Sequence, residues 1–195
     1  MRQYVQLNGY AIRSYRNDNP FFTNIFTFGY FAGFHFGKSL AGDWPPVTGI
    51  TSRARIKGYD CDSCVRGIFI DGDGTNGILV NEAQILGAEP NSYPSVHIVA
   101  NDVSMSISQL DTTWSSANVV RVEGDRNSVL VSDSIVRTWN RSGLGFPAFE
   151  IAEGANNLLQ ISNTLYGDGH GAIPARAIQG TLNVRDLTHA PYIAR

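Results

Sequence analysis

The sequence predicts an all-β chain folded as a parallel β-solenoid of about five or six coils. Its composition is the first reason: 16% of the 195 residues are charged, 43% are hydrophobic and 20 are glycine. Such a chain can bury a core, and it favours strands joined by tight turns over helical bundles. The second reason is an internal repeat of two alternating strands separated by a short turn.

The repeat begins with an alternating triplet of apolar residues, and the successive first residues are 34, 28, 24 and 29 apart. A second alternating strand starts a few residues after four of these triplets, at 78–80, 105–107, 129–131 and 158–161. A period in the twenties with no helical pattern between the strands is typical of coils stacked about 4.8 Å apart. The triplets lie at 34–36, 68–70, 96–98, 120–122 and 149–151.

Alternation within the triplets predicts which side chains face the core. We expect His97, Arg121 and Glu150, the middle residues of three triplets, to point outward. The inward-facing set is Ile68, Ile70, Val96, Ile98, Val120, Val122, Phe149 and Ile151.

Asparagine recurs two residues before the second strand, at Asn76, Asn127 and Asn157, with Val103 at the corresponding place in the remaining unit. Asparagine tolerates the left-handed backbone of tight turns, and its side chain can bond to the coil above or below. The pattern predicts an asparagine ladder; the alternative is that these residues reflect the ordinary preference of asparagine for loops.

The asparagine-bearing turn between two alternating strands resembles that of the right-handed parallel β-helix proteins of the pectate-lyase-like superfamily, over roughly residues 30 to 180. The superfamily includes polysaccharide lyases, glycoside hydrolases and phage tailspikes. The resemblance implies a right-handed β-helix, a polysaccharide or oligosaccharide partner, and an extracellular or virion-associated location. No signal peptide is seen at the N-terminus.

We expect two regions: an irregular or capping segment over residues 1–30 and the β-helix over 31–195. The aromatic-rich residues 20–36 are the expected contact or capping segment, because an uncapped solenoid leaves apolar rows at its ends. A homo-oligomer is therefore expected, with a trimer suggested by the resemblance.

The charge balance bears on the class of partner. Fifteen Lys and Arg against seventeen Asp and Glu give a net charge of -2, which disfavours nucleic acid and anionic membranes as partners. No stretch of apolar residues approaches the roughly 18 that span a membrane.

The candidate binding residues fall beyond the second strands. Aromatic side chains on adjacent coils would form a column of rings on which sugars stack, with arginines as polar neighbours. The alternative is that these rings fold onto the solenoid or pack in a subunit interface. The substrate-binding candidates are Tyr59, Trp114, Trp139, Tyr166, Arg137 and Arg141.

The catalytic candidates are Asp111, Asp168 and His170, with Asp60 and Asp62 as a further pair of carboxylates. Hydrolysis of a glycan needs two carboxylates, whereas a lyase needs a base near the α-proton of a uronate. The two lysines, Lys38 and Lys57, are too few to favour a lysine-dependent lyase. The sequence thus predicts a protein that recognises and cleaves a polysaccharide; the alternative is a non-catalytic structural or adhesive β-helix.

Three further motifs give weaker signals. Cys61 and Cys64 are interpreted as structural thiols or a local disulfide, because a strand and not a helix follows them. The string 71–76 has the acidic residues of a Ca²⁺ clip, although a plain glycine-rich turn is the simpler interpretation. The strings 169–171 and 55–57 resemble polygalacturonase motifs, but they occur in the reverse order. No cofactor or protein-bound metal is required by the prediction.

Overall fold

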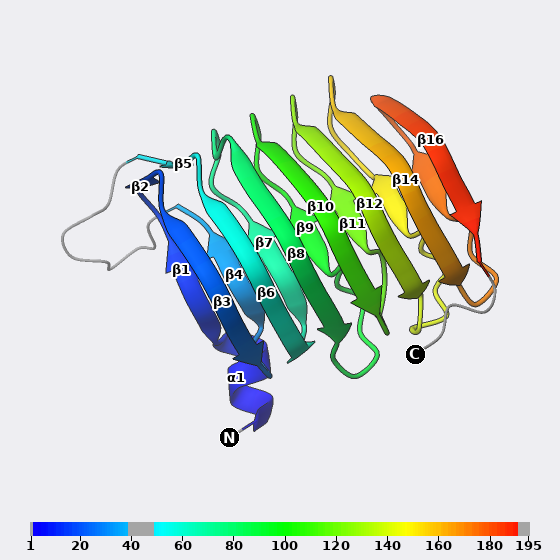
Figure 1. Ribbon diagram of the computed structural model, residues 1–195, viewed down its shortest axis with the longest axis horizontal. Helices are drawn as coiled ribbons and strands as arrows, with labels where there is room; N and C mark the ends of the chain where they lie inside the picture. The colour runs from blue at the N-terminus through cyan, green and yellow to red at the C-terminus, as the bar shows by residue number, and fades with distance from the viewer. Residues whose placement is uncertain (1, 39–48, 191–195) are drawn as a thin grey trace.

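The computed structural model describes residues 2–38 and 49–190, which form two parallel β-sheets facing each other (Figure 1). Each sheet has seven strands, and all strand pairs are parallel. The short-strand sheet contains β1 (Tyr10–Ser14), β4 (Ala32–Phe36), β7 (Arg66–Ile70), β9 (Val96–Ile98), β11 (Val120–Val122), β13 (Phe149–Ile151) and β15 (Ala175–Ala177). The long-strand sheet contains β3 (Phe21–Phe28), β6 (Arg55–Cys64), β8 (Ile78–Gly87), β10 (Ser104–Thr113), β12 (Ser128–Thr138), β14 (Leu158–Asp168) and β16 (Thr181–His189).

The chain alternates between the two sheets, so that each short strand is followed by a long one and the pair makes one coil. Figure 1 shows the chain rising through the rear, short-strand sheet and descending through the front sheet as it advances from left to right, which is a right-handed coil. Five coils, from β4–β6 to β13–β14, have a neighbour on both sides. The predicted fold class is therefore confirmed. A small pair, β2 (Asn17–Asp18) and β5 (Thr51–Ser52), joins the first two coils at a corner.

The core forms from in-register rows between the sheets. Phe34, Ile68, Val96, Val120 and Phe149 follow one another along one row of the short-strand sheet, and each is fully buried. A parallel row two residues on contains Ile70, Ile98, Val122 and Ile151. All eight side chains predicted to face inward are buried. Stacking apolar residues in this way removes apolar surface from water in every coil. Each Å² of apolar surface buried stabilises the fold by about 25 cal/mol.

The second strand of each coil is longer than the sequence predicts, because the strand continues through a bend. At the bend, one residue at the equivalent position of every long strand has a positive φ. The burial pattern of β8 alternates, shifts by one residue at Glu82, and then alternates again. The strand therefore bends without losing its hydrogen-bonded neighbours, and it continues to Gly87, well beyond the expected end at residue 80. The positive-φ column is Asn24, Gly58, Glu82, Gln109, Asp133, Asn163 and Asp186.

The asparagine ladder is present at two of the three predicted positions. The Asn127 side-chain oxygen accepts the Val103 amide at 2.8 Å, and the Asn157 oxygen accepts the Asn127 amide at 2.8 Å. Asn76 differs, because its side chain bonds to Gly74 O within its own turn. The ladder thus joins three coils, and it satisfies backbone amides that would otherwise be buried without a partner.

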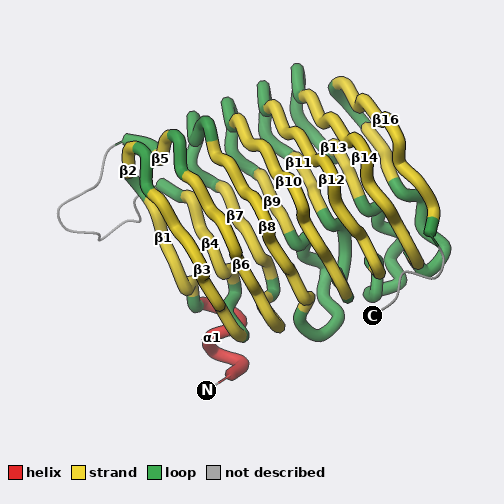
Figure 2. Tube along the Cα trace, in the orientation of Figure 1, coloured by secondary structure: helices red, strands yellow, loops and turns green. Residues whose placement is uncertain are grey.

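Residues before 31 form a short helix and strands that join both sheets of the solenoid. β1 and β3 pair in parallel with β4 and β6, so the two sheets begin at Tyr10. A short helix, α1 (Arg2–Asn8), precedes them; it lies below the first coil in Figures 1 and 2, where Gln6 donates to Ser63 O. At seven residues, α1 is too short to cross a membrane, and no other helix occurs in the described ranges.

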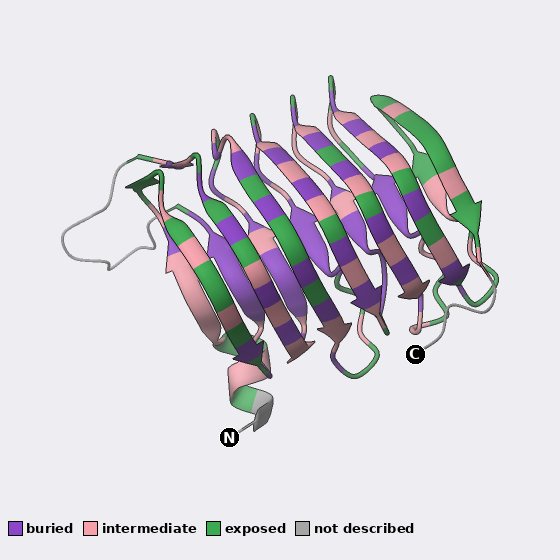
Figure 3. Cartoon of the chain, viewed as in Figure 1, coloured by how far each residue is buried: buried purple, intermediate pink, exposed green. Residues whose placement is uncertain are grey.

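Both ends of the solenoid expose apolar side chains. Phe21, Phe26 and Phe28 of β3 are exposed at one end, and Ile178 and Val184 are exposed at the other. Figure 3 shows the contrast between the buried inner coils and the exposed strand β16. The expected homo-oligomer, and the role of residues 20–36 in it, remains a prediction that these surfaces motivate.

Cys61 and Cys64 are both on β6, buried and not in a disulfide, next to Tyr59 on the same strand and Thr27 on β3. Burial is the main reason that the pKa of Cys61 is raised. A buried thiol with a raised pKa is a poor nucleophile, as Cys61 is, whereas the hydrogen bond with Cys61 lowers the pKa of Cys64. Both are buried and neither is in a disulfide, as expected of structural thiols.

We predict that Asn157→Ala lowers the free energy of unfolding by about 1–3 kcal/mol, because the Asn127 amide and Gly124 O would lose their partner inside the turn. Urea unfolding followed by far-UV circular dichroism measures the change. Asn183→Ala on the exposed strand β16 is the matched control and should change stability by less than about 0.5 kcal/mol. Equal effects of the two substitutions would contradict the ladder.

Candidate functional site

Three loops that follow consecutive long strands lie in register along one edge of the solenoid. We call residues 114–119, 139–148 and 169–174 the loop edge. Ser115 N bonds to Thr138 O and Ser142 N bonds to Ser116 O, so neighbouring loops are tied by backbone hydrogen bonds. Asn140 organises the middle loop: its side-chain oxygen accepts the amides of Gly145 and Phe146, and its Nδ2 donates to Gly169 O. Residues on this edge are therefore positioned by their coils.

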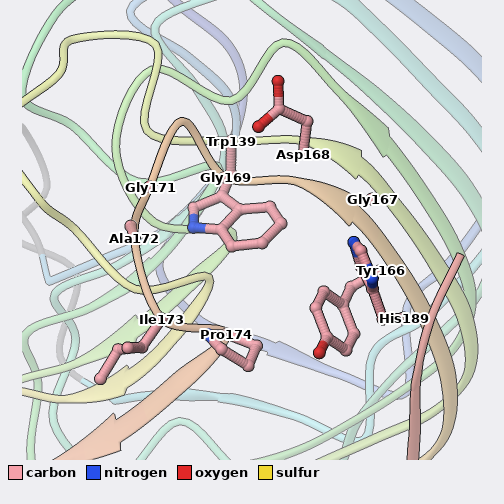
Figure 4. A pocket seen from close by; sticks show the side chains of 10 residues that line it. All are labelled: Trp139, Tyr166, Gly167, Asp168, Gly169, Gly171, Ala172, Ile173, Pro174 and His189. Carbon is pink, nitrogen blue, oxygen red and sulfur yellow. The ribbon is translucent and has the colours of Figure 1, made fainter. Parts of the chain in front are cut away.

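A cavity of about 600 Å³ lies at the C-terminal end of the loop edge (Figure 4). It contains three of the predicted residues and one histidine, His189, that was not predicted. Its lining residues are Trp139, Tyr166, Gly167, Asp168, Gly169, Gly171, Ala172, Ile173, Pro174 and His189.

Aromatic rings from three successive coils meet in this cavity. The Tyr166 ring centre lies 6.1 Å from that of Trp139 and 5.0 Å from that of His189. The Trp139 indole donates to Phe146 O at 3.1 Å and is only 1% exposed, because the Gly169 backbone lies against it. Figure 4 shows the indole between the 169–172 turn and the Tyr166 ring. Trp139 thus forms the wall of the cavity, and Tyr166 and His189 offer the accessible rings.

Asp168 and His170 lie at the rim of the same cavity. Asp168 ends β14, and its carboxylate accepts the His170 backbone amide at 2.7 Å. His170 Nδ1 lies 3.7 Å from the other carboxylate oxygen, and both side chains are exposed. The structure therefore brings together two of the three residues predicted as catalytic.

Asp111 is separate from that pair. It is held by Arg137 through two parallel contacts, Nε–Oδ1 at 2.9 Å and Nη2–Oδ2 at 2.8 Å. The same interaction raises the pKa of Arg137. Both oxygens of this carboxylate are thus engaged by one arginine, which leaves Asp111 poorly placed to contact a substrate.

The remaining binding candidates do not form the expected aromatic column. Tyr59 is 1% exposed inside the core, where its hydroxyl donates to Gly67 O, because the phase shift at Gly58 turns it inward. Trp114 is exposed beside Arg141, two coils before the cavity. Tyr59, Trp114 and the Trp139–Tyr166 pair therefore occupy different environments.

Asp60 and Asp62 lie on β6, and burial is the main reason that the pKa of Asp60 is raised. In the string 71–76, Asp71 bonds to His35 and Asp73 accepts the Asn101 amide. Among the described residues, no three His, Cys, Asp or Glu side chains are grouped to hold a metal ion. The Ca²⁺ clip stays a prediction, and the two carboxylates of the string already have protein partners.

The outer face of the short-strand sheet carries a second cluster of titratable groups. We call the in-register set Arg13, His35, Phe69, His97, Arg121, Glu150 and Arg176 the outer row. Alternation predicted that three of its members face away from the core, and they do, but His97 and Glu150 are buried. They are covered by neighbouring coils and loops; for example, Asn118 donates to Glu150.

Two units of the outer row have the same chemistry. Arg13 Nε donates to His35 Nδ1, and His35 Nε2 lies 2.8 Å from Asp71. Two coils on, Arg66 Nε donates to His97 Nδ1, whose Nε2 lies 3.1 Å from Glu123.

Because each Nδ1 accepts an arginine N–H, each neutral imidazole carries its proton on Nε2. Both nitrogens of His35 have partners, and Nε2 of His97 lies against the Glu123 carboxylate, so both rings are held in place by neighbouring coils. The outer row is accordingly a stabilising network between coils, and the loop edge is the better candidate for binding.

Comparisons with known proteins add no relative: no family model, no curated protein and no solved structure matches this chain. The fold is established by the strand pairing described above, and the function is argued from the site alone.

The outer row predicts that stability falls in acid. Burial lowers the pKa of His97 below its ordinary value of about 6.5, and the N–H that His97 donates lowers the pKa of Glu123. Both groups bind fewer protons in the folded than in the unfolded protein, so stability is highest above pH 6.5. It falls as the pH drops through the folded pKa of His97 and then below the ordinary value of Glu123.

Urea midpoints measured from pH 8 to pH 4.5 should show this decline, and His97→Gln should flatten it below pH 6.5. The exposed His189→Gln is the control for loss of a histidine. An identical pH profile for wild type and His97→Gln would show that the buried histidine does not govern acid stability.

Proposed function

We propose that this protein is a carbohydrate-binding β-solenoid that holds a glycan at the loop-edge cavity without cleaving it. The observation that carries the proposal is the meeting of the Tyr166 and His189 rings with the Asp168 carboxylate around one cavity. A sugar ring needs this combination, because its C–H face packs on an aromatic ring while its hydroxyl groups bond to polar side chains.

The shape and charge of the cavity support a glycan over other small ligands. Its volume of about 600 Å³ lies within the range of about 300–1,000 Å³ that is usual for ligand sites. Three glycines, Gly167, Gly169 and Gly171, line part of the cavity without side chains, so a ligand can approach the backbone there. Among the lining residues that the structure describes there is no lysine or arginine, which disfavours a phosphorylated ligand.

Binding is favoured over hydrolysis because the described lining of the cavity holds a single acidic side chain, Asp168. Glycoside hydrolysis uses two carboxyl groups about 5–9.5 Å apart. Asp111, the other acidic residue predicted as catalytic, is occupied by Arg137. An adhesive role, in which the solenoid recognises a polysaccharide for attachment, therefore fits the site better than degradation.

Polysaccharide cleavage is the second candidate, and the Asp168–His170 contact at 3.7 Å favours it. A carboxylate beside an imidazole can move a proton if a substrate brings its leaving oxygen or its α-proton within reach. If the protein cleaves the polysaccharide, products must form, whereas binding alone yields no product.

The proposal predicts glycan binding that depends on Tyr166. We expect Tyr166→Ala to weaken binding by about tenfold, since it removes the accessible ring, and Tyr4→Ala on α1 to leave affinity unchanged. A glycan array followed by isothermal titration with the best oligosaccharide measures both. Asp168→Asn should also weaken binding, because a charged acceptor becomes a neutral one.

Reducing-end and unsaturated-uronate assays on the bound polysaccharide decide between the two candidates. We expect no product over the course of hours. Product that disappears in Asp168→Asn and His170→Gln would replace adhesion with cleavage, and absence of binding to any glycan would overturn the proposal.

A further inference from the structure

Trp114 is held in a conformation that large side chains rarely adopt. It follows β10 directly and has a φ of 61°. Its amide donates to Thr138 Oγ1 at 2.9 Å, and its carbonyl lies so close to Gly87 that a Cβ there would come within 2.1 Å of it. The backbone is thus fixed between the preceding and the following coil, yet the indole is 40% exposed. A left-handed backbone is strained at a bulky residue, and here it holds a large apolar side chain at the surface.

Arg141 lies over this exposed indole. Its guanidinium carbon is 5.4 Å from the ring centre, and its Nη1 donates to Ala88 O at 3.3 Å. The Arg141 amide bonds to Ser115 O, so the side chain starts from a fixed backbone position. A cation over an indole is stabilised by the ring, and it remains able to donate further hydrogen bonds.

Arg141 lacks the acidic partner that nearby arginines have. Arg137 is paired with Asp111, Arg121 with Glu123, and Arg176 with Glu150. Across residues 2–38 and 49–190, no carboxylate lies within 4.0 Å of the Arg141 guanidinium. Its positive charge is therefore available to an anion from outside the chain.

The Trp114–Arg141 pair and the cavity belong to the same edge of the solenoid. Ser115 N bonds to Thr138 O, and Thr138 pairs with Asp168 on the next strand. Trp114 is consequently two coils from Asp168, which is about 10 Å at the spacing of parallel strands. A ligand longer than one sugar can reach both places along the loop edge.

We infer that Trp114 and Arg141 form a second contact point for the glycan, and that this point takes an acidic sugar residue bearing a carboxylate or a sulfate. The inference rests on the proposed function and specifies its ligand: an acidic oligosaccharide that runs along the loop edge. The indole face packs on the sugar ring, and the guanidinium donates to the anionic group. With a net charge of -2, the chain offers no general attraction for such a ligand, so selection is local.

The test compares acidic and neutral oligosaccharides of equal length and linkage by isothermal titration. One acidic series carries uronic acids and the other carries sulfate, so the two sources of negative charge are distinguished. We expect the wild type to bind one acidic series at least tenfold more tightly than the neutral one, and Arg141→Gln to abolish that preference while neutral binding stays the same. Arg185→Gln removes an equal charge from exposed strand β16 and should change neither affinity.

Trp114→Asn tests the indole separately, because asparagine tolerates the left-handed backbone and keeps the loop in place. This substitution should weaken binding of the acidic oligosaccharide by about tenfold. Equal affinity of wild type and Arg141→Gln for acidic ligands would overturn the inference and leave the cavity proposal intact. So would an equal loss of acidic and neutral binding in Arg141→Gln, which indicates a structural role for its bond to Ala88 O. Absence of binding to both ligand types by the wild type would overturn the proposed function itself.

Discussion

The in-register stacking of parallel coils is the constraint on which the rest of this structure depends. Every backbone group in a long strand must meet its counterpart one coil away, so a bend in one coil requires the same bend in all the others. The seven positive-φ residues from Asn24 to Asp186 are the direct result. Glycine, asparagine and aspartate accept this conformation readily, but Glu82 and Gln109 adopt it because their neighbours impose it.

The same register determines where polar chemistry can occur. Inside the sheets, a polar group keeps its hydrogen bonds only if the adjacent coil supplies the partner, as Asn157 does for Asn127 and Arg66 does for His97. Such groups stabilise the fold, and their hydrogen bonds are not available to a ligand. Side chains on the outer side of the loops do not need a partner from the adjacent coil, because they face solvent. The loop backbones are still fixed by hydrogen bonds to the neighbouring coils. Trp114 in a loop, and Tyr166 and Asp168 at the end of β14 where a loop begins, can therefore combine a defined position with exposure, which a binding site needs.

Much of the fold could be predicted from the sequence because the inward triplets obey a strict alternation. Residues such as Ile68 and Val96 occupy the core as expected. The long strands were harder to predict, since the phase shift at Glu82 or Asp133 breaks the alternation and resembles the end of a strand. Tyr59 and Trp139 were placed among accessible aromatics for that reason, whereas tertiary packing buries both.

The outer row lay beyond sequence reasoning. Its pairs join residues 20 to 40 positions apart, and the period-two pattern shows only that His97 and Glu150 face away from the core. The arginine that fixes the tautomer of each histidine comes from a neighbouring coil, and no local signal marks it. His189 was missed because a lone histidine near the end of a strand has no pattern of its own until Tyr166 is found beside it.

The central claim is that coil stacking builds a glycan site on the loop edge and leaves the two sheet faces as scaffold. Hydrogen–deuterium exchange with and without a bound acidic oligosaccharide tests this claim most directly, because it reports on every coil at once. The account predicts added protection confined to residues 114–119, 139–148 and 166–174, with no change in the front face of β6 and β8. Protection that appears on that front face, or along the outer row, would contradict it.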